Sequence, residues 1–194
     1  MIAIVDSGGA NLASVIFAIE RLNAAYVFTS DAGQIRKASH VILPGVGAAG
    51  SAMRTLRQKG LVECLQNLTQ PVLGICLGMQ LLFAHSEEGG ADMLGIMPAT
   101  ITKFDDTNQT VPHTGWNNVS QVRQNPLFKG LADNAYFYFV HSFYAPEGAY
   151  TAARTEYGVR FSSIVASDNF FGCQFHPERS GAAGAQLLQN FVRL

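Results

Sequence analysis

The sequence predicts an α/β protein whose central sheet is mostly parallel and flanked by helices. Hydrophobic residues make up 48% of the 194 residues, charged residues only 14%, and glycines number 19. That composition is typical of a sheet buried on both faces and joined by tight turns. Short apolar runs also alternate with segments whose apolar residues recur at helical spacing. Repeated strand-helix units favour a parallel sheet with right-handed crossovers.

The first half of the chain contains the clearest of these units. Residues 2–5 form an apolar run that ends at Asp6-Ser7-Gly8-Gly9, which predicts a strand followed by a turn. An amphipathic helix should follow, because apolar residues then recur every three or four positions: Leu12, Val15, Ile16, Ile19 and Leu22. Further along, the same criteria predict strands at residues 26–28, 41–43 and 72–75, and helices at residues 48–58 and 77–84.

A polar segment, residues 87–124, interrupts the pattern. Its glycines, prolines and short polar clusters predict loops and short antiparallel strands, a small addition to the main sheet. Strands are then predicted at residues 136–140, 150–154, 161–166 and 170–174, and a closing helix at residues 182–192. No internal repeat or linker is visible, and the length suits one domain, so a single domain over residues 1–194 is expected.

Composition excludes several classes of function. A net charge of -1 and a sequence pI near 6.5 give no basic field for nucleic acid and no cationic face for a membrane. Three cysteines far apart in sequence suggest neither a disulfide framework nor a zinc site. No signal peptide, membrane-spanning run, phosphate loop or dinucleotide motif is found, so we expect a cytoplasmic protein with no metal and no cofactor.

The strongest local motif is Gly74-Ile75-Cys76-Leu77-Gly78, at the junction of a predicted strand and a predicted helix. This arrangement of small residues around a nucleophile is typical of a nucleophile elbow, here with cysteine. Glycines suit the crowded, strained turn, and the start of a helix would favour a thiolate at Cys76. A buried core cysteine is the alternative, because free cysteine is commonly buried.

His176-Pro177-Glu178 supplies a candidate base and its partner. Residues two apart on an extended segment project to the same side, so Glu178 could support His176 while His176 meets Cys76. The carboxylate would fix the imidazole tautomer and stabilise the imidazolium. Four other histidines lack a carboxylate two residues on or fall in predicted strands and helices, and are interpreted as structural or peripheral: His40, His85, His113 and His141.

Residues 71–80 and 172–178, which contain these two motifs, together resemble the signature blocks of class I glutamine amidotransferases. The resemblance implies a flavodoxin-like α/β fold. Three further segments, residues 43–47, 112–117 and 138–143, are similar to those of HisH-type glutaminase subunits of imidazole glycerol phosphate synthase. The similarity extends over essentially the whole chain.

The resemblance assigns roles to individual residues. Cys76 would attack the side-chain amide of L-glutamine, His176 would carry the proton to the leaving ammonia, and Glu178 would orient His176. Backbone amides would bind the oxyanion, and these are assigned to Leu77 and to one of Gly45, Val46 and Gly47. The residues expected to hold the substrate are Gln80, Ser142 and Phe143.

The resemblance also implies a partner, a (β/α)8-barrel cyclase of the HisF type, which would form a heterodimer with this chain. Ammonia released into neutral water becomes ammonium and cannot attack, so the two subunits must seal the path between them. The residues expected at the interface are Asn11, Trp116 and Asn117. A hypothesis follows that the isolated chain is nearly inactive because the strand at Pro44-Gly45-Val46-Gly47 must reorient on complex formation.

Three alternatives remain open from sequence. The chain could serve another synthase, such as those making anthranilate, pyridoxal phosphate or carbamoyl phosphate, although the segment Pro44-Gly45-Val46-Gly47 differs from the Gly-Gly-Glu-Ser of the pyridoxal type and the Pro-Gly-Pro-Gly of the anthranilate type. It could be a non-catalytic scaffold, against which the intact Cys76, His176 and Glu178 argue. It could also be a freestanding peptidase or γ-glutamyl hydrolase, which would need no partner.

Overall fold

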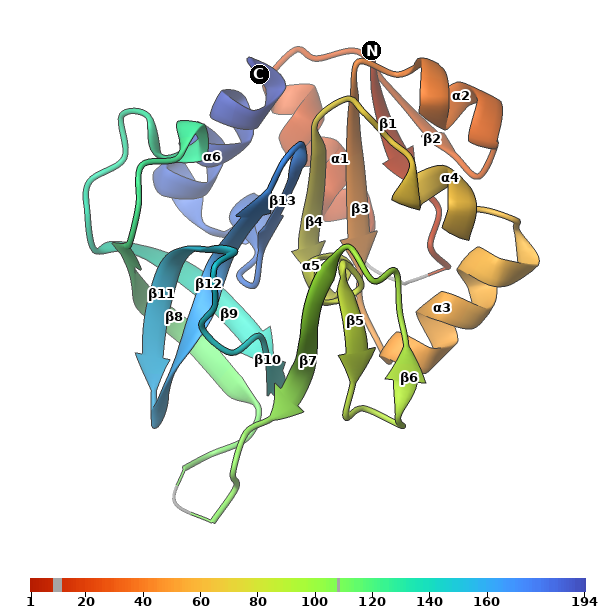
Figure 1. Cartoon of the computed structure of the whole chain (residues 1–194). Helices are drawn as coiled ribbons and strands as arrows, with labels where there is room; N and C mark the ends of the chain where they lie inside the picture. The colour runs from red at the N-terminus through yellow and green to blue at the C-terminus, as the bar shows by residue number, and fades with distance from the viewer. Residues whose placement is uncertain (9–11, 108) are drawn as a thin grey trace.

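The computed structural model describes residues 1–8, 12–107 and 109–194. A nine-stranded sheet runs through the molecule in the order β2-β1-β3-β4-β13-β12-β11-β8-β9, with a four-stranded sheet of order β10-β7-β5-β6 beside it (Figure 1). Helices cover the large sheet, so the predicted α/β class is confirmed. No helix in the described ranges is long and apolar enough to cross a membrane.

The first five strands of the large sheet are parallel. They are β2 (Tyr26–Thr29), β1 (Ile2–Val5), β3 (His40–Gly45), β4 (Val72–Cys76) and β13 (Phe170–Cys173). Because β1 lies between β2 and β3, the order begins 2-1-3-4, which is the flavodoxin-like arrangement. All five were predicted, with ends displaced by no more than two residues.

The remaining four strands are antiparallel and make that part of the sheet larger than the small addition expected. They are β12 (Val159–Ser167), β11 (Thr151–Tyr157), β8 (His113–Gln121) and β9 (Ala135–His141). The nine-residue β8 lies within the polar segment, where only short strands were expected. Its inward positions include His113, whose buried ring packs like an aromatic residue, so the usual apolar alternation is weak.

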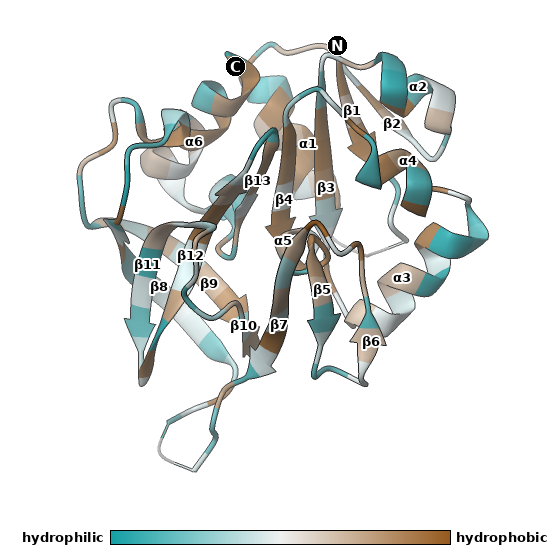
Figure 2. Ribbon diagram, in the orientation of Figure 1, coloured by the Kyte–Doolittle hydropathy of each residue, from teal (hydrophilic) through white to brown (hydrophobic). Residues whose placement is uncertain are grey.

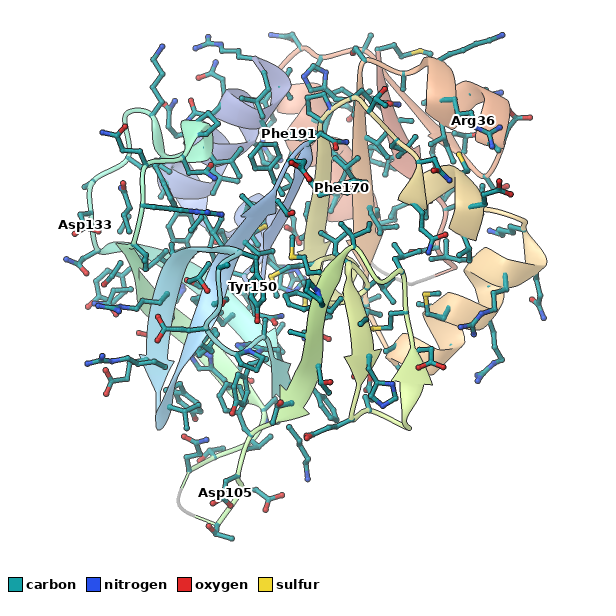
Figure 3. The ribbon with its side chains drawn as sticks, in the orientation of Figure 1. Arg36, Asp105, Asp133, Tyr150, Phe170 and Phe191 are labelled. Carbon is teal, nitrogen blue, oxygen red and sulfur yellow. The ribbon has the colours of Figure 1, made fainter. Side chains whose placement is uncertain are left out.

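Two apolar layers enclose the parallel strands. Alternate residues point to opposite faces, so Ala3 and Val5 pack beneath α2 (Ala32–Lys37), α3 (Ala49–Gln58) and α4 (Val62–Gln66). Ile2 and Ile4 belong to the other core, under α1 (Leu12–Arg21) and α6 (Gly181–Val192). Figure 2 shows the resulting hydrophobic strands inside more hydrophilic helices. In Figure 3, Arg36, Asp105 and Asp133 lie at the periphery, whereas Tyr150, Phe170 and Phe191 lie over the sheets.

The predicted helix at residues 77–84 is wrong over its second half. Helix α5 covers only Leu77–Gln80, and the chain continues as β5 (Phe83–Ser86). β5 pairs with β6 (Ala91–Asp92) and β7 (Met97–Lys103), and β10 (Phe143–Tyr144) completes the small sheet. Phe83 is fully buried against Tyr150, with ring centroids 5.0 Å apart, so tertiary packing overrides the helical pattern here. The short helices α2 and α4 were not predicted.

Candidate active site

The ends of three parallel strands bring the predicted site residues together. In the pairing of β3 with β4, Gly45 lies opposite Cys76, and in the pairing of β13 with β4, Cys173 lies opposite Ile75. The carboxyl ends of these strands therefore meet at one edge of the sheet, where open α/β sheets bind their ligands. His176 follows β13 by three residues and reaches the same edge.

Cys76 occupies a sharp turn between β4 and α5. Its backbone angles, φ 53° and ψ -112°, are unusual for a residue with a side chain, as expected for a nucleophile elbow. A Cβ atom on Gly78 would overlap the Leu43 carbonyl oxygen, so only glycine fits there. α5 is only one turn long, so it has no long helix dipole. The partial positive charge near Cys76 comes instead from the first free N–H groups of α5.

His176 and Glu178 form a buried pair. His176 Nδ1 lies 2.8 Å from Glu178 Oε1, and the side chains are only 6% and 2% exposed. A 3-10 turn (Pro177–Arg179) returns Glu178 to the imidazole, in place of the extended segment expected. Burial lowers the pKa of His176, but hydrogen bonds with Cys76 and Glu178, and their charges, outweigh it and raise that pKa from 6.5 to about 10.

A cavity of about 370 Å³ opens over this pair. Its walls include eight of the predicted residues: Val46, Gly47, Cys76, Leu77, Gln80, Ser142, Phe143 and His176. Gly45, the last residue of β3, and Glu178, which is bound to His176, are not among the lining residues. A larger hollow of about 850 Å³ has no cysteine or histidine among its described lining residues, and the Arg123 guanidinium there already binds the carbonyls of Tyr150 and Ala166.

Gln80 is buried rather than solvated, and its amide nitrogen is engaged by the protein. It donates to the Phe143 carbonyl and to Gln174 Oε1, each at 3.0 Å. Gln174 Nε2 in turn lies 3.8 Å from Cys76 Sγ. Both hydrogens of the Gln80 amide are therefore used, and only its oxygen is left for a ligand in the cavity.

The comparisons with known proteins identify the family of this chain. The family model described as "Glutamine amidotransferase class-I" matches residues 3–194. The imidazole glycerol phosphate synthase subunit HisH of Idiomarina loihiensis is 53% identical, over 100% of this chain and 97% of its own. The subunits of the same name from Yersinia pseudotuberculosis and Haemophilus influenzae are each 49% identical, over 96% or more of both chains. The chain belongs to the class I glutamine amidotransferases, in the HisH family of glutaminase subunits.

Solved structures share the fold of this amidotransferase at low identity. A crystal structure of a glutamine amidotransferase superposes with a TM-score of 0.75 at 16% identity, over 99% of this chain and 97% of the other. The structure of PurLQS from Thermotoga maritima gives 0.72 at 18%, with the same coverage. The predicted family and fold are confirmed.

Trp116 and Asn117, two of the residues predicted at the partner interface of the amidotransferase, are not among the residues that line the cavity. Trp116 is 56% exposed on β8, and Tyr136 on the neighbouring β9 is 60% exposed. Asn117 is half-buried and donates to His113 Nε2 at 3.3 Å and to the Glu156 carbonyl at 3.1 Å. Asn11 lies outside the described residues.

Sequence reasoning missed several residues at the site of the amidotransferase. Gln174, which lies beside Cys76, precedes His176 by two positions, so the alternation that joined His176 to Glu178 could have found it. Three other missed residues line the cavity: Glu88, Arg179 and His141. Glu88 had no local signal, because the pairing of β5 with β7 brings its turn to the cavity. The described residues hold no group of three or more histidine, cysteine, aspartate or glutamate side chains placed to bind a metal.

Proposed function

We propose that this chain is the glutaminase subunit of imidazole glycerol phosphate synthase, and that Cys76, His176 and Glu178 hydrolyse L-glutamine to glutamate and ammonia. One observation carries the catalytic assignment: the Cys76 thiol shares a cavity with an imidazole that is bound, on its other nitrogen, to a buried carboxylate. The arrangement of nucleophile, base and orienting acid is that of acyl-transfer enzymes.

The reaction proceeds through a thioester. His176 holds the proton of the Cys76 thiol while Sγ attacks the side-chain carbonyl carbon of glutamine. The tetrahedral intermediate collapses, the C–N bond breaks, and the imidazolium gives its proton to the leaving ammonia. Water, deprotonated by His176, then attacks the γ-glutamyl thioester, and glutamate leaves as the thiol re-forms. Glu178 keeps His176 in one tautomer throughout.

The negative charge of the tetrahedral oxygen needs donors placed in advance. We assign them to the Leu77 amide, the first of α5, and to an amide within Gly45, Val46 and Gly47. Val46 and Gly47 face the cavity that Cys76 opens into, which supports this choice. Gly47 has φ +91°, a backbone conformation that glycine adopts without strain.

The two charged groups on the α-carbon of glutamine require partners of opposite charge. The Glu88 carboxylate suits the α-ammonium group, the Arg179 guanidinium suits the α-carboxylate, and both line the cavity. The backbone of Ser142 and Phe143, with the Gln80 amide oxygen, would fix the remaining polar groups. These contacts would aim the side-chain amide at Cys76.

The ammonia passes to a HisF-type (β/α)8 cyclase, in a heterodimer that forms imidazole glycerol phosphate and aminoimidazole carboxamide ribonucleotide for histidine biosynthesis. The interface includes Asn11, Trp116 and Asn117. Its support is the name shared by the relatives and the exposed aromatic side chains of Trp116 and Tyr136 on the β8-β9 hairpin. Three free, buried cysteines are consistent with a reducing cytoplasm.

We extend the proposal to the rest of the chain. Residues 1–194 would act as one glutamine amidotransferase domain, in line with the family match to residues 3–194. The hydrolysis needs no cofactor or metal, because the thiol, imidazole and carboxylate supply the nucleophile and the proton transfers.

The test is glutamate release from glutamine by the chain, alone and with a HisF-type cyclase carrying its ribonucleotide ligand. Activity that requires the cyclase and is lost in Cys76→Ala would support both the chemistry and the pathway. Cysteine-dependent activity without response to the cyclase would keep the glutaminase and reassign the synthase. Activity that survives Cys76→Ala would remove the catalytic assignment.

A further inference from the structure

A buried row of side chains leads from the β8-β9 hairpin to the active site. Asn117 Nδ2 lies 3.3 Å from His113 Nε2, His113 Nδ1 lies 3.0 Å from His141 Nε2, and His141 Nδ1 lies 2.8 Å from the Phe143 carbonyl oxygen. His113 and His141 are 3% and 6% exposed. Neither histidine has a part in the chemistry proposed above.

The contact between His141 and the Phe143 carbonyl determines which atom donates in each of the other contacts. The Phe143 carbonyl can only accept, so His141 carries its hydrogen on Nδ1. Burial lowers the pKa of His141 to about 3 and that of His113 to about 4, so both rings are neutral near pH 7. His141 Nε2 must then accept from His113 Nδ1, and His113 Nε2 must accept from Asn117. One tautomer of each ring satisfies the whole row.

The Phe143 carbonyl also joins the row to the nucleophile. It accepts a second hydrogen bond from Gln80 Nε2 at 3.0 Å, and the same nitrogen donates to Gln174 Oε1 at 3.0 Å. Gln174 must therefore turn its own amide nitrogen toward Cys76 Sγ, 3.8 Å away. Donors in this second arm run in one direction, from Gln80 through Gln174 to the sulfur.

We propose that Asn117, His113 and His141 form a relay of positioning residues that holds the Phe143 carbonyl and, through Gln80 and Gln174, places a hydrogen-bond donor on Cys76. The inference deepens the glutaminase function proposed above and rests on it. Burying two neutral imidazoles costs free energy unless every nitrogen is paired, and here each is. The relay also links the nucleophile to the residue after Trp116, in the hairpin assigned to the partner.

Loss of the hydrogen bond donated by His113 should change the hydrogen bonding of Cys76 Sγ. Without it, nothing holds His141 Nε2 as an acceptor, and the other tautomer would turn an Nδ1 lone pair toward the Phe143 carbonyl. The carbonyl would then move, and Gln80 and Gln174 would lose the orientation that it gives them. The Cys76 thiol would then lose the amide donor of Gln174, although no residue in contact with the thiol has been substituted.

Two substitutions at His113 separate this role from packing. His113 stacks on Tyr157 and Phe139, with ring centroids 4.0 and 4.9 Å apart. His113→Phe keeps the stacked ring and removes the donor, whereas His113→Asn keeps a donor nitrogen near the position of Nδ1 and removes the ring. A relay predicts more activity in His113→Asn than in His113→Phe. A packing role predicts the reverse order.

Two readouts are used, glutaminase kinetics and a measure of Cys76 reactivity that does not depend on glutamine. The first is kcat and KM for glutaminase activity in the complex with the cyclase. The second is the rate at which iodoacetamide alkylates Cys76 in the chain alone, with Cys76→Ala as the blank. We expect both kcat and the alkylation rate to fall about tenfold in His113→Phe, the effect of losing one or two hydrogen bonds. His113→Asn should recover part of each.

Tyr157→Phe is the matched control, because Tyr157 stacks on the His113 imidazole but its hydroxyl binds the Thr110 carbonyl, outside the relay. It should leave both rates unchanged. Asn117→Leu, at the half-buried outer end, gives the same test if His113→Phe does not fold. Equal rates in wild type, His113→Phe and Asn117→Leu, or higher rates in His113→Phe than in His113→Asn, would overturn the relay. Absence of Cys76-dependent glutaminase activity in wild type would instead overturn the proposed function.

Discussion

Two links join the backbone of Tyr138 to that of His176, one a direct hydrogen bond and the other through the Ser180 hydroxyl. The His176 N–H donates to the Tyr138 carbonyl at 2.9 Å. The Tyr138 N–H donates to Ser180 Oγ at 3.0 Å, and that hydroxyl donates to the His176 carbonyl at 2.6 Å. The position of the imidazole therefore depends on a hydroxyl that belongs to neither the nucleophile nor the acid.

Removal of this hydroxyl should slow the reaction without weakening substrate binding. Ser180→Ala leaves the Tyr138 N–H without its partner, and the His176 carbonyl keeps only the hydrogen bond from the Arg179 N–H. Ser180 is only 2% exposed. We expect a loss of about 1 to 3 kcal/mol in the free energy of unfolding. The kcat for glutamine should fall about tenfold with KM nearly constant, because the base His176 is displaced whereas the residues assigned to substrate binding are not. Urea unfolding and steady-state glutaminase assays measure the two effects.

Ser163→Ala is the control for Ser180→Ala. Ser163 is fully buried, and its hydroxyl oxygen has no hydrogen-bond partner within the described part of the chain. Its removal should leave both stability and kcat close to those of wild type. Equal losses in the two variants would show that any buried serine here behaves alike, and would contradict the special role of Ser180.

A second prediction concerns the close packing of the elbow. Gly78→Ala places a methyl group on the Leu43 carbonyl oxygen, so β3 and α5 must separate. We expect a loss of about 3 kcal/mol or more and almost no activity. Gly50→Ala is matched, because Gly50 lies in α3 and its new Cβ would approach no atom closer than 3.8 Å. That change should stabilise the protein by about 0.5 to 1 kcal/mol. Thermal unfolding checks the prediction, because Tm should fall in Gly78→Ala and rise in Gly50→Ala.

The parallel half of the fold could be predicted because local signals agree with tertiary structure there. Strands such as Ile2–Val5 are buried on both faces and read as continuous apolar runs. The helix predicted at residues 77–84 failed because its apolar residues serve two different neighbours, the elbow and the small sheet. Periodicity records that a residue is buried, and not against which element it packs.

The same limit applies to the site. Cys76, His176 and Glu178 carry local motifs, so sequence could find them. Glu88 lies in the turn between β5 and β6, and only the pairing of strands brings it to the cavity. His113 and His141 face each other across β8 and β9, at the first position of one strand and the last of the other. That register could not be read from sequence, because the polar segment obscured β8.

The buried His176–Glu178 pair gives the protein a pH dependence. Because the folded state raises the pKa of His176 from 6.5 to about 10, its protonation stabilises the fold fully below pH 6.5, and this stabilisation is lost as the pH rises to about 10. Glu178→Gln removes one of the two groups that raise the pKa. The difference in unfolding free energy between these two pH values should therefore be smaller in Glu178→Gln than in wild type.

Urea titrations of wild type and Glu178→Gln across that range provide the measurement. The same substitution should lower kcat about a hundredfold or more, because an amide can present its donor to the imidazole and favour the wrong tautomer. A pH dependence of stability that is identical in the two proteins would mean that Glu178 does not set the charge of His176.

The last prediction tests the β8-β9 hairpin as the face that meets the partner. Trp116→Ala removes a large, exposed aromatic side chain, of the kind that contributes most to binding at interfaces. We expect its affinity for a HisF-type cyclase to fall by about 2 kcal/mol, roughly thirtyfold in Kd, measured by titration calorimetry. Phe28→Ala is matched, because Phe28 is 44% exposed on β2, at the opposite edge of the nine-stranded sheet. It should bind as wild type does, and a greater loss there than at Trp116 would place the partner on the other edge.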